Sequence, residues 1–138
     1  MPDTDTPKGE TVLVVDDEID VRVLVRDVLS RHGYHVLETG DPFEARRLVE
    51  KQPVHLLLTD VVMPIMNGLE LATRVEAVSP TTKVLLMSGY STAAVKGAGR
   101  PLLPKPFQAD DLVNAVRQIL SSRSAFRRPS PPDPTKPA

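Results

Sequence analysis

The chain has 138 residues, and its 17 Lys and Arg against 18 Asp and Glu leave a formal net charge of −1. This length suits one compact domain, and the charge balance disfavours binding of nucleic acid through the body of the protein. The absence of cysteine excludes disulfides, thiolate metal sites and cysteine catalysis. No apolar stretch reaches membrane-spanning length and the first residues are polar, so we expect a cytoplasmic protein without a membrane segment.

The distribution of proline separates two tails from a central body. Five of the 14 prolines lie in residues 123–138, which are also rich in arginine. We expect this stretch to be a flexible tail, because it lacks the apolar residues needed to pack a core. Residues 1–9 are expected to form a flexible N-terminal segment, and residues 10–122 the folded domain.

Short apolar strands alternate with amphipathic helices along the body. Strands are predicted at Thr11–Val15, Tyr34–Glu38, His55–Thr59, Lys83–Met87 and Leu102–Leu103. Helices are predicted over Val21–Leu29 (ending near Gly33), Pro42–Lys51, Leu71–Val78 and Leu112–Leu120, with weak periodicity over Tyr90–Arg100. This alternation predicts an α/β fold in which helices cover both faces of a parallel sheet.

Polar residues follow four of the predicted strands. Asp16 and Asp17 follow the first strand, Asp60 the third, Ser88 the fourth and Lys105 the fifth. Parallel strands end at one edge of the sheet, where ligands bind in such folds. Taken singly, Asp17 would serve as a helix cap and Asp60 as a turn residue. Together, the three carboxylates repel one another and require a compensating positive charge.

Lys105 supplies one such charge, and a bound cation would supply the rest. Oxygen ligands alone indicate Mg²⁺, or alternatively Mn²⁺. Zinc is disfavoured because His32, His35 and His55 lie at a helix end and at strand starts, away from the carboxylates. A carboxylate beside a divalent cation and a lysine is suited to accepting a phosphoryl group, to which the Ser88 hydroxyl would donate a hydrogen bond.

Four motifs occur in order: VLVVDDE (Val12–Glu18), DVVMPIMNG (Asp60–Gly68), LLMSGY (Leu85–Tyr90) and PKPF (Pro104–Phe107). With these motifs the chain resembles the receiver domain of two-component response regulators over about residues 10–122. The resemblance implies a flavodoxin-like (βα)5 fold, a doubly wound parallel sheet with strand order 2-1-3-4-5.

The resemblance also implies roles for individual residues. Asp60 would be the phosphoacceptor, Lys105 would pair with the phosphoryl group, and Ser88 would provide the switch hydroxyl. The implied Mg²⁺ ligands are Asp16, Asp17, Asp60 and the backbone carbonyl of Val62. The Lys105–Pro106 peptide is typically cis in this family.

The sequence departs from the family pattern in two places. Leu102 occupies the switch position, where an aromatic residue is usual, so the usual coupling between hydroxyl and ring is in question. Tyr90 is aromatic but lies at a different position, where it would border the pocket. Only 16 residues separate Ser88 from Lys105, which predicts a short or irregular fourth helix. This shortening resembles the receivers of hybrid sensor histidine kinases.

The predicted function is phosphorelay signalling, in which a sensor histidine kinase or histidine phosphotransfer domain phosphorylates Asp60. The chain would be a stand-alone receiver or part of a hybrid kinase. It would not be an enzyme, apart from supporting its own phosphotransfer and dephosphorylation. A weak homodimer is left open. One alternative, which Leu102 keeps open, is a degenerate receiver that serves as an interaction scaffold. A haloacid-dehalogenase-like phosphatase is disfavoured because Val62 stands where that class has a second Asp.

Overall fold

The computed structural model describes residues 9–89 and 99–121. Five parallel strands form one sheet in the order β2-β1-β3-β4-β5, which confirms the predicted fold class and strand order. The strands are β1 (Thr11–Val15), β2 (His35–Thr39), β3 (Leu56–Asp60), β4 (Lys83–Ser88) and β5 (Leu102–Pro104).

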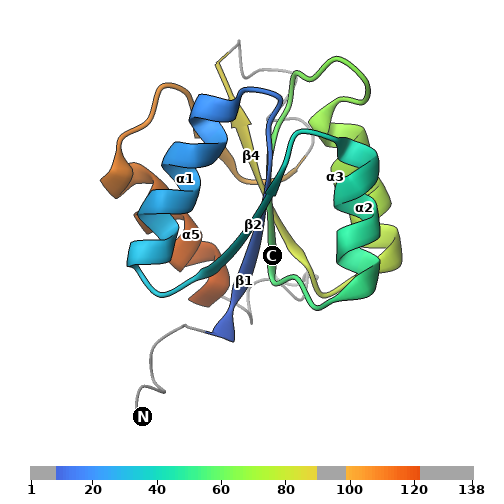
Figure 1. The fold of residues 1–138 in the computed structure, drawn as a ribbon, viewed down its shortest axis with the longest axis horizontal. Helices are drawn as coiled ribbons and strands as arrows, with labels where there is room; N and C mark the ends of the chain where they lie inside the picture. Colours follow the sequence, from blue (N-terminus) through green and yellow to red (C-terminus); the bar gives the residue numbers. More distant parts are fainter. Residues whose placement is uncertain (1–8, 90–98, 122–138) are drawn as a thin grey trace, which may run out of the picture.

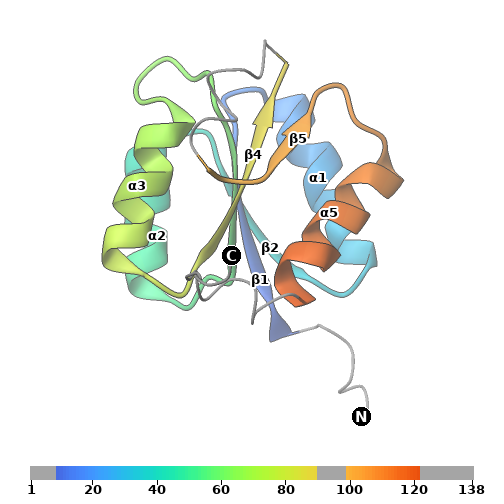
Figure 2. The ribbon, with the colours of Figure 1, turned by 180° about the vertical axis from the view of Figure 1, so that it is seen from behind.

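Helices cover both faces of this sheet. They are α1 (Ile19–Arg31), α2 (Pro42–Lys51), α3 (Gly68–Val78) and α5 (Ala109–Ser121). α1 and α5 lie together on one face, and α2 and α3 lie together on the other (Figures 1 and 2). The predicted short fourth helix, Tyr90 and the predicted C-terminal tail lie outside the described residues.

Two strands are displaced by one residue from the predicted bounds. β2 begins at His35 rather than Tyr34, because the Tyr34 N–H donates to the Leu29 carbonyl at 3.2 Å after the turn at Gly33, where φ is 92°. β3 extends to Asp60 rather than ending at Thr59. Asp60 is therefore the last residue of a central strand, paired in register with Met87 on β4.

The adjacent interior strands β1 and β3 are buried along their whole length. Val12, Val14 and Leu58 belong to the core that packs beneath α1 and α5. Leu13 and Leu57 belong to the core beneath α2 and α3. A continuous apolar run suits a parallel strand because both of its faces are covered. This packing fixes the ends of β1 and β3, where the acidic residues lie.

The start of α3 lies directly against the end of β3, and Gly68 makes this approach sterically feasible. The Gly68 N–H donates to the Val61 carbonyl at 2.8 Å. A Cβ at residue 68 would lie 2.1 Å from the carbonyl oxygen of Asp60 and 3.0 Å from Cα of Val61. The Asn67 side chain caps the helix by accepting from the Glu70 N–H at 2.8 Å. Gly68 thus couples the geometry of α3 to the backbone of Asp60.

We predict that Gly68→Ala lowers the free energy of unfolding by about 2 kcal/mol, because the added methyl group meets backbone atoms that yield only if the strand or the helix moves. Urea unfolding followed by circular dichroism measures the loss. Gly89→Ala is the matched control, since its Cβ would meet only Cβ of Lys105 at an ordinary 3.7 Å. Equal stability of Gly68→Ala and the wild type would contradict the packing described for α3.

Candidate functional site

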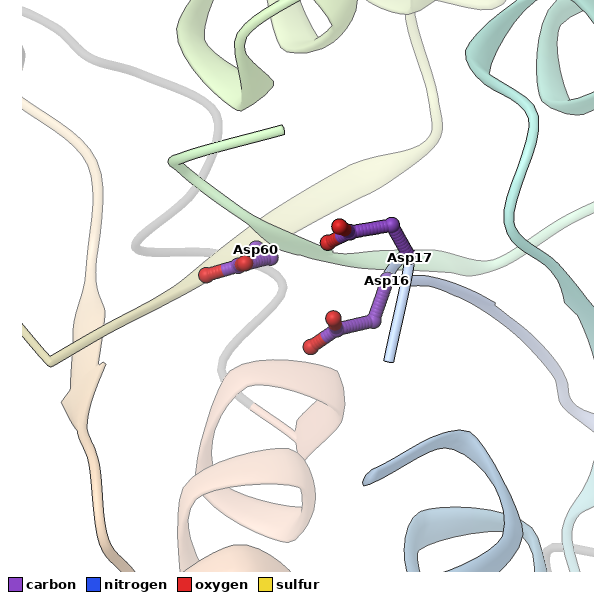
Figure 3. Close-up of side chains that lie close together, drawn as sticks. All are labelled: Asp16, Asp17 and Asp60. Carbon is purple, nitrogen blue, oxygen red and sulfur yellow. The ribbon is translucent and has the colours of Figure 1, made fainter. Parts of the chain in front are cut away.

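The residues predicted to form the site come together at the carboxyl-terminal edge of the sheet. Asp16 and Asp17 follow β1, and Asp60 ends the neighbouring strand β3. Figure 3 shows the Asp16 and Asp17 side chains extending toward Asp60. One carboxylate oxygen from each of the three residues lies within 4.8 Å of the other two. The cluster arises because β1 and β3 are adjacent parallel strands that end at the same level.

Lys105, which follows β5, places an ammonium group among these carboxylates. Its Nζ donates to Oδ2 of Asp16 at 3.0 Å and lies 3.4 Å from Oδ1 of Asp60. It also contacts Oε1 of Glu18 at 3.4 Å. The side chain is only 18% exposed, so solvent screens these attractions weakly. Lys105 therefore offsets part of the repulsion within the acidic cluster.

The buried carboxyl groups have perturbed pKa values. Asp16 is fully buried, and this burial raises the pKa of its carboxyl above the ordinary value despite hydrogen bonds from Glu18 and Lys105. Burial, together with the charge of Asp16, likewise raises the pKa of Asp60. For Lys105, burial acts to lower the pKa, but the hydrogen bond and charge of Asp16 and the charge of Asp60 outweigh it and the net shift is upward. The metal-free site thus favours extra positive charge.

The donor atoms at the site fit a hard divalent cation. Asp17 is exposed, and its carboxylate forms no hydrogen bond or ion pair within the described part of the chain. It opens on a cleft of about 520 Å³ that is also lined by Glu18, Asp60, Val62, Gly89 and Lys105. Val62 lies half-exposed in this lining, and the resemblance implies its backbone carbonyl as a further ligand. Carboxylate and carbonyl oxygens beside an open cleft are the ligands that Mg²⁺ prefers.

Histidine contributes nothing to this cluster. The Nδ1 of His55 accepts from the Thr11 N–H at 2.9 Å, at the start of the strands. The Nδ1 of His32 lies 2.9 Å from the Val28 carbonyl at the end of α1. Within residues 9–89 and 99–121, the carboxylates of Asp16, Asp17 and Asp60 form the one group of three potential ligands. Within the described residues, the candidate metal ligands at this site are therefore oxygen atoms.

The two predicted switch residues lie on β4 and β5. Ser88 ends β4, is 2% exposed, and lies one residue beyond the Met87 that pairs with Asp60. Leu102 pairs with Leu86 and packs, partly buried, against the core beneath α2 and α3. The Lys105 N–H donates to the Ser88 carbonyl at 2.8 Å, and the Lys105–Pro106 peptide is cis, as the resemblance implies.

Three residues near the site were not singled out from the sequence. Glu18 pairs with a lysine 87 positions away, and such a contact has no local sequence signal. Arg22 donates to the carbonyl of Asp16, so its contact is with the main chain rather than with a recognisable side chain. In the sequence, Gly68 stood out only as the last residue of the DVVMPIMNG motif, whereas in the structure it also permits the close approach of α3 to β3.

Comparison with known proteins agrees with this geometry. The family model of the response regulator receiver domain matches residues 12–117. The chain therefore belongs to the receiver domain family of two-component signal transduction, as the four motifs predicted. Within the described residues, none of the helices combines the length and the apolar character of a membrane span.

Two curated relatives differ in overall length. The DNA-binding transcriptional regulator NtrC of Azospirillum brasilense is 38% identical over 119 residues, which are 83% of this chain but only 25% of that protein. The response regulator receiver protein CpdR of Brucella abortus is 35% identical over 114 residues, which are 79% of this chain and 95% of that protein. The chain thus spans a quarter of one relative and nearly all of the other.

Solved structures give the same family. The receiver domain of the hybrid histidine kinase CckA is 35% identical, with a TM-score of 0.70, and the match covers 80% of this chain and 98% of that one. The chemotaxis protein CheY4 of Vibrio cholerae is 29% identical, with a TM-score of 0.76 and the same coverage. These similarities support the fold and the family of the chain.

The raised pKa values predict an unusual pH dependence of stability. A carboxyl whose pKa is higher in the folded state destabilises the fold when ionised, and this penalty disappears as the pH falls through the folded-state pKa. Without metal, Asp60→Asn should therefore be more stable than the wild type at pH 7, because burial and the charge of Asp16 raise the pKa of the Asp60 carboxyl. The difference in stability should shrink as the pH falls, because Asp60 then takes up a proton.

Urea unfolding in the presence of a chelator, between pH 4 and pH 7, measures this difference. Asp27→Asn is the control, because the Asp27 side chain is 50% exposed on α1 and should change stability little. Destabilisation by Asp60→Asn at pH 7 would show that the attraction between Lys105 and Asp60 exceeds the cost of burying the charge.

Proposed function

We propose that this receiver domain accepts a phosphoryl group on Asp60 from a histidine kinase or a histidine phosphotransfer domain, in an Mg²⁺-dependent reaction. The observation that carries the proposal is the cluster of the Asp16, Asp17 and Asp60 carboxylates, with the Nζ of Lys105 lying 3.0 Å from Asp16 and 3.4 Å from Asp60. The open cleft is lined by Asp17, Asp60 and Lys105, which would supply a metal ligand, the nucleophilic oxygen and a positive charge.

The proposed reaction is a nucleophilic displacement at phosphorus. A carboxylate oxygen of Asp60 forms the new O–P bond, and the P–N bond to the donor histidine breaks. The imidazole nitrogen leaves with the electron pair. Lys105 neutralises negative charge on the transferred phosphoryl oxygens, which is the main contribution that a protein makes to phosphoryl transfer. Attack of water on the resulting acyl phosphate returns inorganic phosphate and restores Asp60.

The groups proposed to hold Mg²⁺ are the carboxylates of Asp16, Asp17 and Asp60 and the backbone carbonyl of Val62. When bound, the ion supplies positive charge that offsets repulsion between these carboxylates and the incoming phosphoryl oxygens. Mn²⁺ takes the same kind of oxygen ligands and would substitute for it. Asp17 is the exposed ligand, so it would meet the ion first, while buried Asp16 remains paired with Lys105.

The proposed partners and setting follow from the family. Relatives include the autoinducer 1 sensor kinase/phosphatase LuxN of Vibrio harveyi, of which the match covers 14%, and the sporulation initiation phosphotransferase F of Bacillus subtilis, of which it covers 98%. We propose a cytoplasmic receiver that is either stand-alone or part of a hybrid kinase. Its chemistry would be limited to its own phosphorylation and dephosphorylation.

Incubation with acetyl phosphate and Mg²⁺ should add one phosphoryl group to the chain, because a small donor can reach the open cleft. Intact mass spectrometry measures the gain. Omitting Mg²⁺ should reduce the gain strongly, and Asp60→Asn should abolish it while keeping the fold, since the amide is nearly isosteric with the carboxylate.

Labelling of Asp60→Asn to the wild-type extent would refute Asp60 as the acceptor. No labelling of the wild type, either by acetyl phosphate or by a phosphorylated histidine phosphotransfer domain, would favour the scaffold alternative that Leu102 keeps open. Asp27→Asn serves as a control for a general effect of losing a carboxylate, and should label like the wild type.

A further inference from the structure

Arg22, in the first turn of α1, contacts the acidic cluster through the main chain. Its Nη1 donates to the carbonyl oxygen of Asp16 at 2.8 Å, and its Nε donates to Oε1 of Glu38 on β2 at 3.2 Å. The side chain is 18% exposed. The carbonyl that accepts from Arg22 belongs to the peptide group that joins Asp16 to Asp17, so the guanidinium holds the link between two proposed metal ligands.

The contact with Arg22 completes the hydrogen bonding of Asp16. The Asp16 N–H donates to the Thr39 carbonyl at 3.2 Å. Its Oδ1 accepts from the Glu18 N–H at 2.9 Å, and its Oδ2 accepts from Lys105 at 3.0 Å. With Arg22 on the carbonyl, each of the four polar groups of Asp16 has a partner. The backbone orientation at this residue is thereby fixed, and with it the position from which the adjacent Asp17 faces the cleft.

Gly40 provides the space that the guanidinium occupies. A Cβ at residue 40 would lie 2.7 Å from Nη1 of Arg22 and 3.4 Å from the Asp16 carbonyl oxygen. The backbone of Gly40 does not adopt the left-handed conformation that favours glycine. The glycine is therefore explained by the close approach of Arg22 to the main chain and not by backbone conformation.

We propose that Arg22 is a positioning residue for the divalent-cation site. It ties the Asp16–Asp17 peptide to Glu38 on β2 and so fixes the geometry of the two carboxylates that face the cation. This inference rests on the proposed function, because it concerns the cation that Asp16 and Asp17 are proposed to bind. The positive charge of Arg22 by itself opposes cation binding, so a favourable contribution of Arg22 must come from geometry.

Arg26 offers a matched control on the same helix. Its Nη1 donates to the other carboxylate oxygen of Glu38, Oε2, at 2.7 Å, and its side chain is 45% exposed. Within the described residues its partners are Glu38 and Asp27, and it does not contact Asp16. Replacing Arg26 or Arg22 by glutamine removes one positive charge and one partner of Glu38 in each case, but only the Arg22 variant frees the Asp16 carbonyl.

The test is a titration of the full chain with Mg²⁺, followed in ¹H–¹⁵N NMR spectra. Arg22→Gln should raise the dissociation constant for Mg²⁺ about 10-fold, the usual size of the effect when a residue that orients a metal ligand is lost. Arg26→Gln should leave the dissociation constant unchanged or lower it slightly, because removing a positive charge favours cation binding. Arg22→Lys should behave like Arg22→Gln, because an ammonium group lacks the fork that spans Asp16 and Glu38.

The metal-free spectra give a second readout. The amide N–H of Asp17 belongs to the peptide whose carbonyl accepts from Arg22, so its resonance should shift in Arg22→Gln and stay in place in Arg26→Gln. Gly40→Ala should weaken Mg²⁺ binding and shift the same resonance without changing the net charge, since its methyl group displaces the end of the Arg22 side chain. If Arg22→Gln fails to fold, Gly40→Ala still tests whether the position of Arg22 affects Mg²⁺ binding.

Equal Mg²⁺ affinities of Arg22→Gln and Arg26→Gln would overturn the inference. Asp17→Ala removes a proposed ligand and so shows how much Mg²⁺ affinity is lost when the site itself is damaged. If the wild type binds Mg²⁺ and Asp17→Ala does not, while Arg22→Gln binds normally, the inference fails and the proposed site stands. If the wild type does not bind Mg²⁺, the proposed cation site and the inference fail together.

Discussion

The site depends on a cluster of three carboxylates at the edge of a parallel sheet, two of which contact one ammonium group. Two of them, from Asp16 and Asp60, are buried, and water cannot screen their repulsion well. Lys105 reaches both and offsets part of this cost. The compensation is incomplete, because the pKa values of both carboxyls remain raised. The negative charge that Lys105 leaves uncompensated favours the binding of a cation.

The fold brings these charges together from three separate strands. β1 and β3 are neighbours, so the acidic residues at their ends meet directly, whereas Lys105 follows β5 and reaches past β4. The apolar cores on both faces of the sheet hold the strands in register. Gly68 allows α3 to approach the backbone of Asp60 more closely than a residue with a side chain would. Gly40 leaves room for the Arg22 side chain beside the backbone of Asp16. The positions of the charges therefore depend on packing as much as on the charged residues themselves.

Much of the fold and of the acidic cluster could be predicted from the sequence, because alternating strands and helices imply that all strand ends lie at one edge. The juxtaposition of Asp16, Asp17, Asp60 and Lys105 follows from that rule. The start of β2 could not be placed to the residue, because the Tyr34 N–H bonds back to α1 across the turn at Gly33. The contacts of Glu18 and Arg22 were also beyond prediction, since one joins distant parts of the chain and the other involves a backbone carbonyl.

In the proposed reaction Asp60 carries the phosphoryl group, and Asp16 and Asp17 do not. Borohydride reduces an aspartyl phosphate to homoserine, which marks the acceptor permanently. The full chain is treated with acetyl phosphate and Mg²⁺, then with borohydride, and its peptides are fragmented in a mass spectrometer. We expect homoserine at position 60. Homoserine at position 16 or 17, or intact aspartate at all three positions, would contradict it.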